Sequence, residues 1–257
     1  FANMFKGEKA VIGMVHLPPL PGTAGFDGDM ERIYRRALED AGALEAGGAG
    51  ALLVENFSDI PYAKELSLEQ STALAAAAAM VKSNPSLPVG IDAAFCDCKA
   101  ALACAKASGA DFVRLAVFVD TVECFAGIME PCCTEAIPYR RHIRGENIMI
   151  FADVQVKHTH MLVPGIDIVE SAVTAQDCGA DAIIVTGAAT GSETPIDSVA
   201  RVKRAVKCPV LIGSGVSEEN IRSQLEVADG AIVGSSLKTD GKIDGRKVRG
   251  MMDKLRG

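Results

Sequence analysis

The strongest constraint on the fold is a short apolar run that recurs eight times along the chain. The runs lie at residues 10–15, 51–55, 89–92, 112–117, 148–153, 182–186, 210–213 and 230–233, and a helical pattern follows each. Their apolar residues are nearly continuous rather than alternating, which is typical of parallel strands buried on both faces. Eight units in 257 residues give about 32 residues per unit, the size of a strand–helix unit in a (β/α)8 barrel.

The segments between the runs support this interpretation. Met30, Ile33, Ala37, Ala41 and Leu44 recur every three or four residues and predict one apolar helix face. Gly-Ala-Asp occurs at 109–111 and 179–181, with Ala-Asp-Gly at 228–230 as a looser third case. Each lies where a helix should end and a strand begin, because glycine closes a helix in the left-handed conformation.

An open, doubly wound sheet is the main alternative. Such a sheet rarely has eight equivalent units, and no G-x-G-x-x-G follows the first run. We therefore expect an α/β fold, a (β/α)8 TIM barrel that forms a single domain over residues 1–257. The least regular part should be a loop at about residues 118–130, after the fourth strand.

Composition excludes several classes of protein. The formal net charge of −7 argues against nucleic-acid binding, and zero Trp with 5% aromatic residues leaves few rings for stacking on bases. The most apolar stretch, residues 73–81, is about half of the roughly 20 residues that span a bilayer, so no transmembrane segment is expected. The first residues lack the layout of a secretory signal, and the eight cysteines form no disulfide framework. These features favour the cytoplasm.

Catalytic groups of a barrel come from the carboxyl ends of its strands and the loops that follow. In this chain those positions carry His16, Glu55, Asn56, Asp92, Arg114, Asp153, Lys157, His158, Thr186 and Gly187.

Two glycine loops after the last two strands indicate a phosphate site. They are Gly213-Ser214-Gly215 and Gly234-Ser235-Ser236, and barrels commonly bind phosphate through backbone N–H groups of these two loops. The alternative is that the glycines only form tight turns. Thr-Gly at 186–187 and 190–191 either extends the same site or forms a turn, and Lys238 either adds charge to it or is simply solvated.

Proton transfer is assigned first to Asp153 and Lys157. If the strand continues, Asp153, Gln155 and Lys157 share one face, and a carboxylate beside a lysine can tune either pKa. The alternative is a buried ion pair that only holds the strand end.

Further carboxylates strengthen the catalytic interpretation. Glu55 and Asp92 should converge on the same rim, where they could share proton transfer or hold Mg²⁺, although no cofactor is firmly implied. His16 is either a third member of this group or a structural histidine. No cysteine pair has the C-x₂-C spacing of a zinc site, so no metal ligands are assigned.

These motifs together resemble the BtpA/SgcQ family. The resemblance runs from about residue 9 to the end of the chain. It is carried by HLPPLPG at 16–22, ENFSDIP at 55–61, ADVQVKH at 152–158, the Thr-Gly pairs, GSGV at 213–216 with Asn220, and VGSSLK at 233–238. It implies a ribulose-phosphate-binding type of TIM barrel. One branch of the family is named for photosystem I biogenesis, the other for a gene cluster of sugar-phosphate metabolism.

Two segments depart from the family pattern. A family stretch like NVLRND is DAAFCD at 92–97, and a loop like TDQG is replaced within VECFAG at 122–127. Exchange of Arg for Phe95 removes an anion clamp and adds an apolar wall. The departures imply a retained phosphate site with an altered substrate body.

We therefore expect an enzyme that acts on a phosphorylated sugar or nucleotide-like metabolite. The barrel is compatible with a homo-oligomer. Isomerase or epimerase, lyase and glycosyl-transfer chemistry all remain open. The alternative is a non-catalytic assembly or regulatory factor that keeps the phosphate site for ligand sensing.

Overall fold

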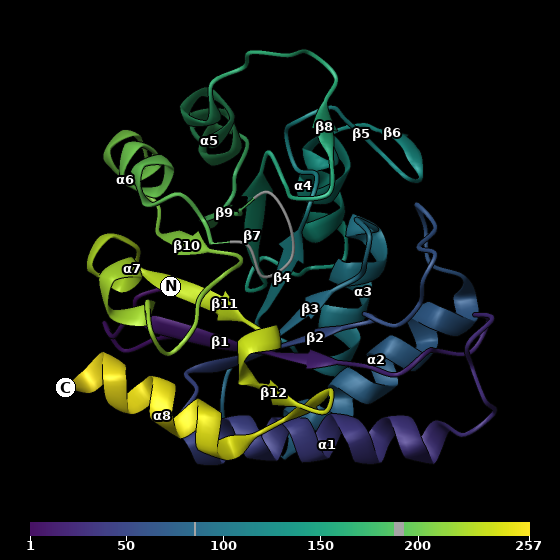
Figure 1. The fold of residues 1–257 in the computed structure, drawn as a ribbon. Helices are drawn as coiled ribbons and strands as arrows, with labels where there is room; N and C mark the ends of the chain where they lie inside the picture. The colour runs from purple at the N-terminus through teal and green to yellow at the C-terminus, as the bar shows by residue number, and fades with distance from the viewer. Residues whose placement is uncertain (85, 188–192) are drawn as a thin grey trace.

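The computed structural model describes residues 1–84, 86–187 and 193–257. Eight parallel strands close into a barrel in the order β1-β11-β10-β9-β7-β4-β3-β2 (Figure 1). Their bounds are β1 Ala10–His16, β2 Ala51–Glu55, β3 Val89–Asp92, β4 Phe112–Leu115, β7 Met149–Val154, β9 Ala182–Val185, β10 Val210–Ile212 and β11 Gly230–Val233. Each expected strand is confirmed to within two residues at either end, and the closed order confirms the TIM barrel over the open sheet.

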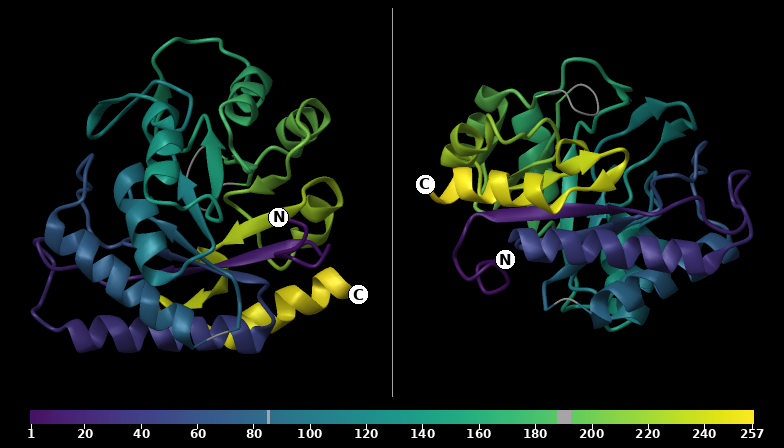
Figure 2. Two further views of the ribbon diagram at one scale, coloured as in Figure 1. Left: turned by 180° about the vertical axis from the view of Figure 1, so that it is seen from behind. Right: turned by 60° about the horizontal axis from the view of Figure 1, so that its bottom comes forward.

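Helices in the described part of the chain cover the outside of the barrel (Figure 2). They are α1 Met30–Gly47, α2 Leu68–Ser83, α3 Cys98–Ser108, α4 Cys133–His142, α5 Ile168–Asp177, α6 Ile196–Ala205, α7 Ile221–Val227 and α8 Gly245–Arg256. The predicted apolar face of α1 is confirmed, since Ile33, Ala37, Ala41 and Leu44 are all buried. Within the described ranges, no helix is both long enough and apolar enough to cross a membrane.

Alternate residues of each strand belong to two different cores. In β1, Ile12 faces the barrel interior, whereas Val11 belongs to the layer between strands and helices. Burial of both faces explains why the strands read as nearly continuous apolar runs. Inside the barrel, the rings of Phe112 and Phe151 stack with centroids 4.5 Å apart, and Phe1 of the N-terminal segment lies 5.8 Å from Phe151.

Three aspartates fix the strand register at the amino ends of the strands. Each accepts a hydrogen bond from a backbone N–H near the start of a neighbouring strand and pairs with a cation from a helix. The sets are Asp111 with Val89 and Lys82, Asp181 with Ile150 and Arg140, and Asp229 with Val210 and Lys203. Gly109 and Gly179 precede two of them with φ of 74° and 97°, which confirms the expected left-handed helix ends.

The expected irregular loop at residues 118–130 is wrong in part, because it contains two short strands. β5 Val122–Cys124 and β6 Gly127–Met129 form an antiparallel hairpin, and β5 also pairs with β8 His160–Met161. The partner strand β8 comes from the segment after β7, so the pairing depends on a contact distant in sequence. This small sheet lies beyond the carboxyl ends of β4 and β7 (Figure 1).

A 3₁₀ turn and a second small hairpin follow the last barrel strand. They are η1 Ser235–Leu237 and the antiparallel strands β12 Lys238–Thr239 and β13 Lys242–Ile243. Helix α8 then packs alongside α1 (Figure 1).

Candidate active site

A pocket of about 370 Å³ lies at the carboxyl ends of the barrel strands. Twelve of the predicted site residues line it: His16, Glu55, Asp92, Arg114, Lys157, His158, Gly213, Ser214, Gly215, Gly234, Ser235 and Ser236. Asp153, Asn56, Thr186 and Gly187 are not part of the lining. Thr190 and Gly191 lie outside the described residues.

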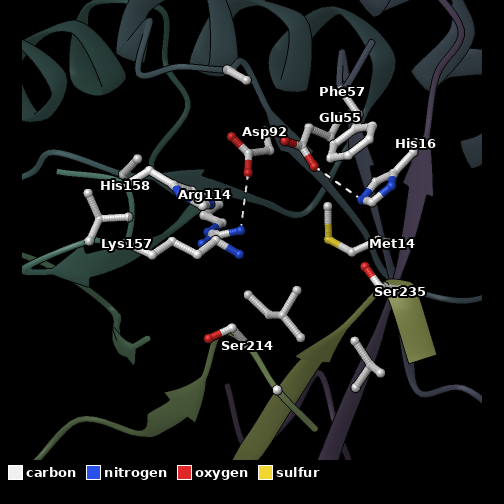
Figure 3. Close-up of a pocket in the computed structure, with 18 of the residues that line it drawn as sticks. Met14, His16, Glu55, Phe57, Asp92, Arg114, Lys157, His158, Ser214 and Ser235 are labelled. Atoms are coloured by element: carbon white, nitrogen blue, oxygen red, sulfur yellow. Dashed lines mark ion pairs between the residues drawn. The ribbon is translucent and has the colours of Figure 1, made fainter. Parts of the chain in front are cut away.

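Two carboxylates form one wall of the pocket. Glu55 and Asp92 are directly paired residues at the ends of β2 and β3. Burial raises the pKa of Glu55, and burial together with the charge of Glu55 raises the pKa of Asp92 well above its ordinary value. Figure 3 shows both carboxylates across the open centre of the pocket from Ser214 and Ser235.

A buried cation lies beneath these carboxylates. Arg114 at β4 forms two hydrogen bonds to Asp153, Nε to Oδ2 at 2.8 Å and Nη2 to Oδ1 at 2.9 Å. Its Nη1 lies 3.5 Å from Oδ2 of Asp92. Asp153 is only 1% exposed, so it holds the guanidinium in place from below the pocket.

The predicted shared face of Asp153, Gln155 and Lys157 is wrong. Strand β7 ends at Val154, and Gln155 has a φ of 47° that breaks the strand alternation. The side-chain amide of Gln155 does not line the pocket, and its Nε2 donates to the backbone oxygen of Ile166.

Lys157 reaches the pocket by this irregular path. Its backbone N–H donates to Oγ1 of Thr186 at 3.0 Å, so Thr186 positions the Lys157 backbone from beneath the lining. Burial and the charge of Arg114 lower the pKa of the Lys157 ammonium. No carboxylate among the described residues lies within ion-pair distance of that ammonium.

His16 is held neutral between two charged neighbours. Its Nε2 lies 3.4 Å from Oε2 of Glu55, and its Nδ1 contacts the ammonium of Lys238. Burial, reinforced by the charge of Lys238, lowers the pKa of His16 to about 3. An ammonium can only donate, so Nδ1 accepts from Lys238 and Nε2 carries the proton that faces Glu55. The ring also stacks on Phe57, with centroids 4.0 Å apart.

The two glycine loops form the wall opposite the carboxylates. Gly215 has a φ of 73°, and a Cβ at Gly213 would lie 2.6 Å from Ile184, so both positions favour glycine. Ser236 Oγ donates to Val216 O at 2.7 Å and joins the two loops.

Several backbone donors of these loops face no acceptor. Within the described part of the chain, the N–H groups of Gly215, Val216, Ser235 and Ser236 have no hydrogen-bond partner. In other proteins, backbone N–H groups grouped in this way bind anions. By contrast, Ser214 Oγ accepts from the N–H of Gly187 at 2.8 Å, so Gly187 supports the loop after β10.

Asn56 positions the backbone after β3 and does not line the pocket, whereas the sequence predicted a contact with substrate. It is fully buried; its Oδ1 accepts from Ala94 N–H at 2.7 Å, and its Nδ2 donates to Asp59 and to Ala94 O. These bonds fix the backbone after β3. The motif ENFSDIP alone could not distinguish this role, because Asn56 directly follows the pocket residue Glu55.

Sequence reasoning missed most of the apolar lining. Phe57, Ile60 and Tyr62 from the loop after β2 line the pocket. Phe95 from the loop after β3 also lines it, where the departure from the family pattern implies an apolar wall. The signal available was the position of these rings directly after two strand ends.

The cysteines do not add a recognisable metal centre. Sγ of Cys96 lies 3.9 Å from Sγ of Cys132. Among the residues that the structure describes, no group of three or more His, Cys, Asp or Glu side chains is arranged to hold a metal ion.

Similar proteins are found by sequence and by structure. An uncharacterized protein of Archaeoglobus fulgidus is 39% identical over 250 residues, 97% of this chain and 100% of that protein. The photosystem I biogenesis protein BtpA of Synechocystis is 37% identical over 244 residues, 93% of this chain and 84% of that protein.

Solved structures with the same fold are more distant. Geranylgeranylglyceryl phosphate synthase of Thermoplasma acidophilum, in complex with sn-glycerol-1-phosphate, has a TM-score of 0.63 at 16% identity and covers 99% of this chain and 96% of its own. Phosphoribosylanthranilate isomerase of Pyrococcus furiosus has a TM-score of 0.61 at 13% identity, covering 97% and 99%. At these identities the likeness supports the barrel alone. The family model named BtpA family matches residues 7–257, and with the close relatives it shows that this chain belongs to the BtpA family.

Proposed function

We propose that this protein is an enzyme that binds a phosphorylated small molecule and transfers protons on the part of it that faces Glu55 and Asp92. One observation carries the proposal: a single pocket joins a group of unpartnered backbone N–H donors to a pair of carboxylates with raised pKa. The first group suits an anion, and the second suits acid–base chemistry near neutral pH.

The phosphate would occupy the side of the pocket formed by the loops after β10 and β11. Gly215 and Ser235 there offer backbone donors and no side-chain carboxylate. The solved barrel of the Thermoplasma synthase, which contains sn-glycerol-1-phosphate, supports a phosphorylated ligand by analogy of fold.

The chemistry would be divided among the groups on the opposite side. A carboxyl group with a raised pKa can keep its proton near neutral pH and serve as an acid, whereas an ionised one serves as a base. Glu55 and Asp92 fit these two roles, and Lys157, with its lowered pKa, is a third candidate for proton transfer. Asp153 is assigned the positioning of Arg114, because its carboxylate is already saturated by the guanidinium. Isomerisation or epimerisation needs only such proton transfers and is our preferred reaction class.

Thermal stabilisation by inorganic phosphate and by ribose 5-phosphate tests the anion site. A ligand that binds only the folded state raises the melting temperature. Gly215→Asp should abolish the effect, because a carboxylate would occupy and repel the anion. Gly109→Asp is a matched control: its φ of 74° is close to the 73° of Gly215, it has open space around it, and it lies at the other end of the barrel. Equal stabilisation of both variants would refute the anion site.

A second candidate is a non-catalytic assembly factor that senses the same ligand. The name of the Synechocystis relative, photosystem I biogenesis protein BtpA, favours it. The two functions differ in turnover. A protein that binds a phosphorylated ligand and returns it unchanged and without hydrogen exchange in deuterated water would support the assembly factor.

A further inference from the structure

We propose that the ligand carries an aromatic or heteroaromatic ring at the end remote from its phosphate, and that this ring stacks on an aromatic wall at the pocket mouth. The inference rests on the proposed function and names the substrate class of the same site. We define the aromatic wall as Phe57, Tyr62, Phe95 and Phe125 with Ile60.

The wall is built from three separate loops. Phe57, Ile60 and Tyr62 follow β2, and Phe95 follows β3; all four line the pocket. Phe125, from the β5–β6 turn, does not line the pocket but contacts two of these rings. Its ring centroid lies 5.8 Å from that of Phe95 in an edge-on arrangement and 6.1 Å from that of Tyr62.

Several of the aromatic rings of this chain lie at this pocket. The chain has no Trp, nine Phe and three Tyr; Phe125 contacts the rings of Phe95 and Tyr62, and Phe57 lines the same pocket and stacks on His16. Ile60 is 65% exposed, Phe125 59% and Phe57 37%. Large apolar side chains clustered and exposed at a concave site indicate a ligand that covers them.

The Phe95 end of the wall lies across the barrel from the Gly215 loop of the proposed phosphate site, whereas Phe57 lies nearer to the loop after β11, 5.6 Å from Nζ of Lys238. In the closed strand order, three strands separate β3, which precedes Phe95, from β10 in either direction, whereas only β1 separates β2 from β11. Figure 3 shows Asp92 and Glu55 on one side of the pocket and Ser214 on the opposite side. A ligand with its phosphate at Gly215 therefore extends its far end toward the wall and passes over the carboxylates.

The aromatic wall would contact the flat face of a ligand ring rather than hydrogen-bond to its polar edge. The hydroxyl of Tyr62 already donates to the backbone oxygen of Phe57 at 2.6 Å. A bare sugar phosphate would present hydroxyl groups to this apolar surface and leave them without partners, whereas a planar ring would stack on it.

Calorimetric titration with matched ligands tests the inference. Ribose 5-phosphate, adenosine 5′-monophosphate and uridine 5′-monophosphate share phosphate and sugar and differ in the ring. At least one nucleotide should bind at least about fivefold more tightly than ribose 5-phosphate, the lower end of the gain from stacking one base. Phe95→Leu keeps apolar volume and removes the ring, so it should abolish that gain and leave the affinity for ribose 5-phosphate unchanged.

Two further variants keep the test decisive. Ile60→Ser changes an exposed pocket residue and should also reduce the gain even if Phe95→Leu does not fold. Leu68→Ser, at a 79% exposed position outside the pocket lining, is the control and should behave as the wild type.

The outcomes separate this inference from the proposed function. Binding of ribose 5-phosphate with no gain from either base, or an equal loss of sugar and nucleotide affinity in Phe95→Leu and Ile60→Ser, overturns the aromatic wall and leaves the phosphate site intact. Unchanged affinities in both wall variants, as expected if the wall docks a protein, overturn it as well. Absence of binding by every phosphorylated probe contradicts both proposals.

Discussion

The guanidinium of Arg114 and the carboxylate of Asp153 form a buried two-bond ion pair directly beneath the pocket. The pair links β4 to β7, and the remaining nitrogen of Arg114 faces Asp92 at 3.5 Å. A charge placed there sets the electrostatics of the whole mouth, since it counteracts the effect of burial on the pKa of both Glu55 and Asp92.

Asp153→Asn should destabilise the fold. It leaves a buried guanidinium without its full counter-charge, which costs about 3–5 kcal/mol for buried pairs. Chemical denaturation measures the loss. Glu135→Gln is the control, because its ion pair with Lys99 is more than half exposed on both sides and such pairs contribute at most about 1 kcal/mol. A similar small effect at both positions would contradict the structural role of Asp153.

Asp92→Asn should behave differently, with an effect that depends on pH. Burial raises the pKa of Asp92, so the folded protein retains a proton that the unfolded chain loses above about pH 4. The stability from this group is present below the unfolded pKa and is lost as pH rises through the folded pKa. An asparagine does not ionise, so the variant should gain stability relative to the wild type as pH rises above about 4. A difference in unfolding free energy that stays constant with pH would refute this.

His16→Gln should reduce the sensitivity of the fold to acid. The unfolded histidine takes up a proton below about pH 6.5, but burial and Lys238 lower the folded pKa to about 3. The unfolded state therefore binds more protons between these two values, and the wild type loses stability as pH falls through this window. Denaturation of wild type and variant at pH values from about 7 to 4 should show the steeper fall in the wild type. Parallel curves would show that His16 is not held neutral.

Asn56→Ala should loosen the segment after β3. The backbone N–H of Ala94 would lose its acceptor in a buried place, which costs about 1–3 kcal/mol. Asn84→Ala serves as the control, because the Asn84 amide bonds to Met80 O at an exposed position. Hydrogen exchange at Ala94 should rise in the first variant and stay unchanged in the second.

Lys157→Met should keep the fold and lose catalysis. The ammonium is partly buried and has no ion-pair partner among the described residues. Its removal therefore deprives no carboxylate of an ion-pair partner. Turnover of the phosphorylated substrate should fall by at least about a hundredfold, the low end for a general acid or base. A variant with full activity and normal ligand binding would remove Lys157 from the proposed mechanism.

The barrel and most of the residues at its mouth were predictable from the amino-acid sequence. A strand buried on both faces must be apolar along its whole length, so all eight strands were visible as local runs. Parallel barrel strands also carry their functional side chains at the carboxyl ends, and this rule alone brought Glu55, Asp92 and the two glycine loops to one pocket.

Which of these groups pair with one another, and which line the pocket, depends on the packing of the strands. Asp153 is paired with Arg114 rather than with Lys157, because β4 and β7 are neighbours in the closed barrel while the chain turns at Gln155 before it reaches Lys157. The aromatic wall likewise combines the loops after β2 and β3 with the β5–β6 turn, which the side-by-side pairing of β2, β3 and β4 brings together. Local patterns report whether a residue is buried, but the partner of a buried charge depends on side chains far away in the sequence.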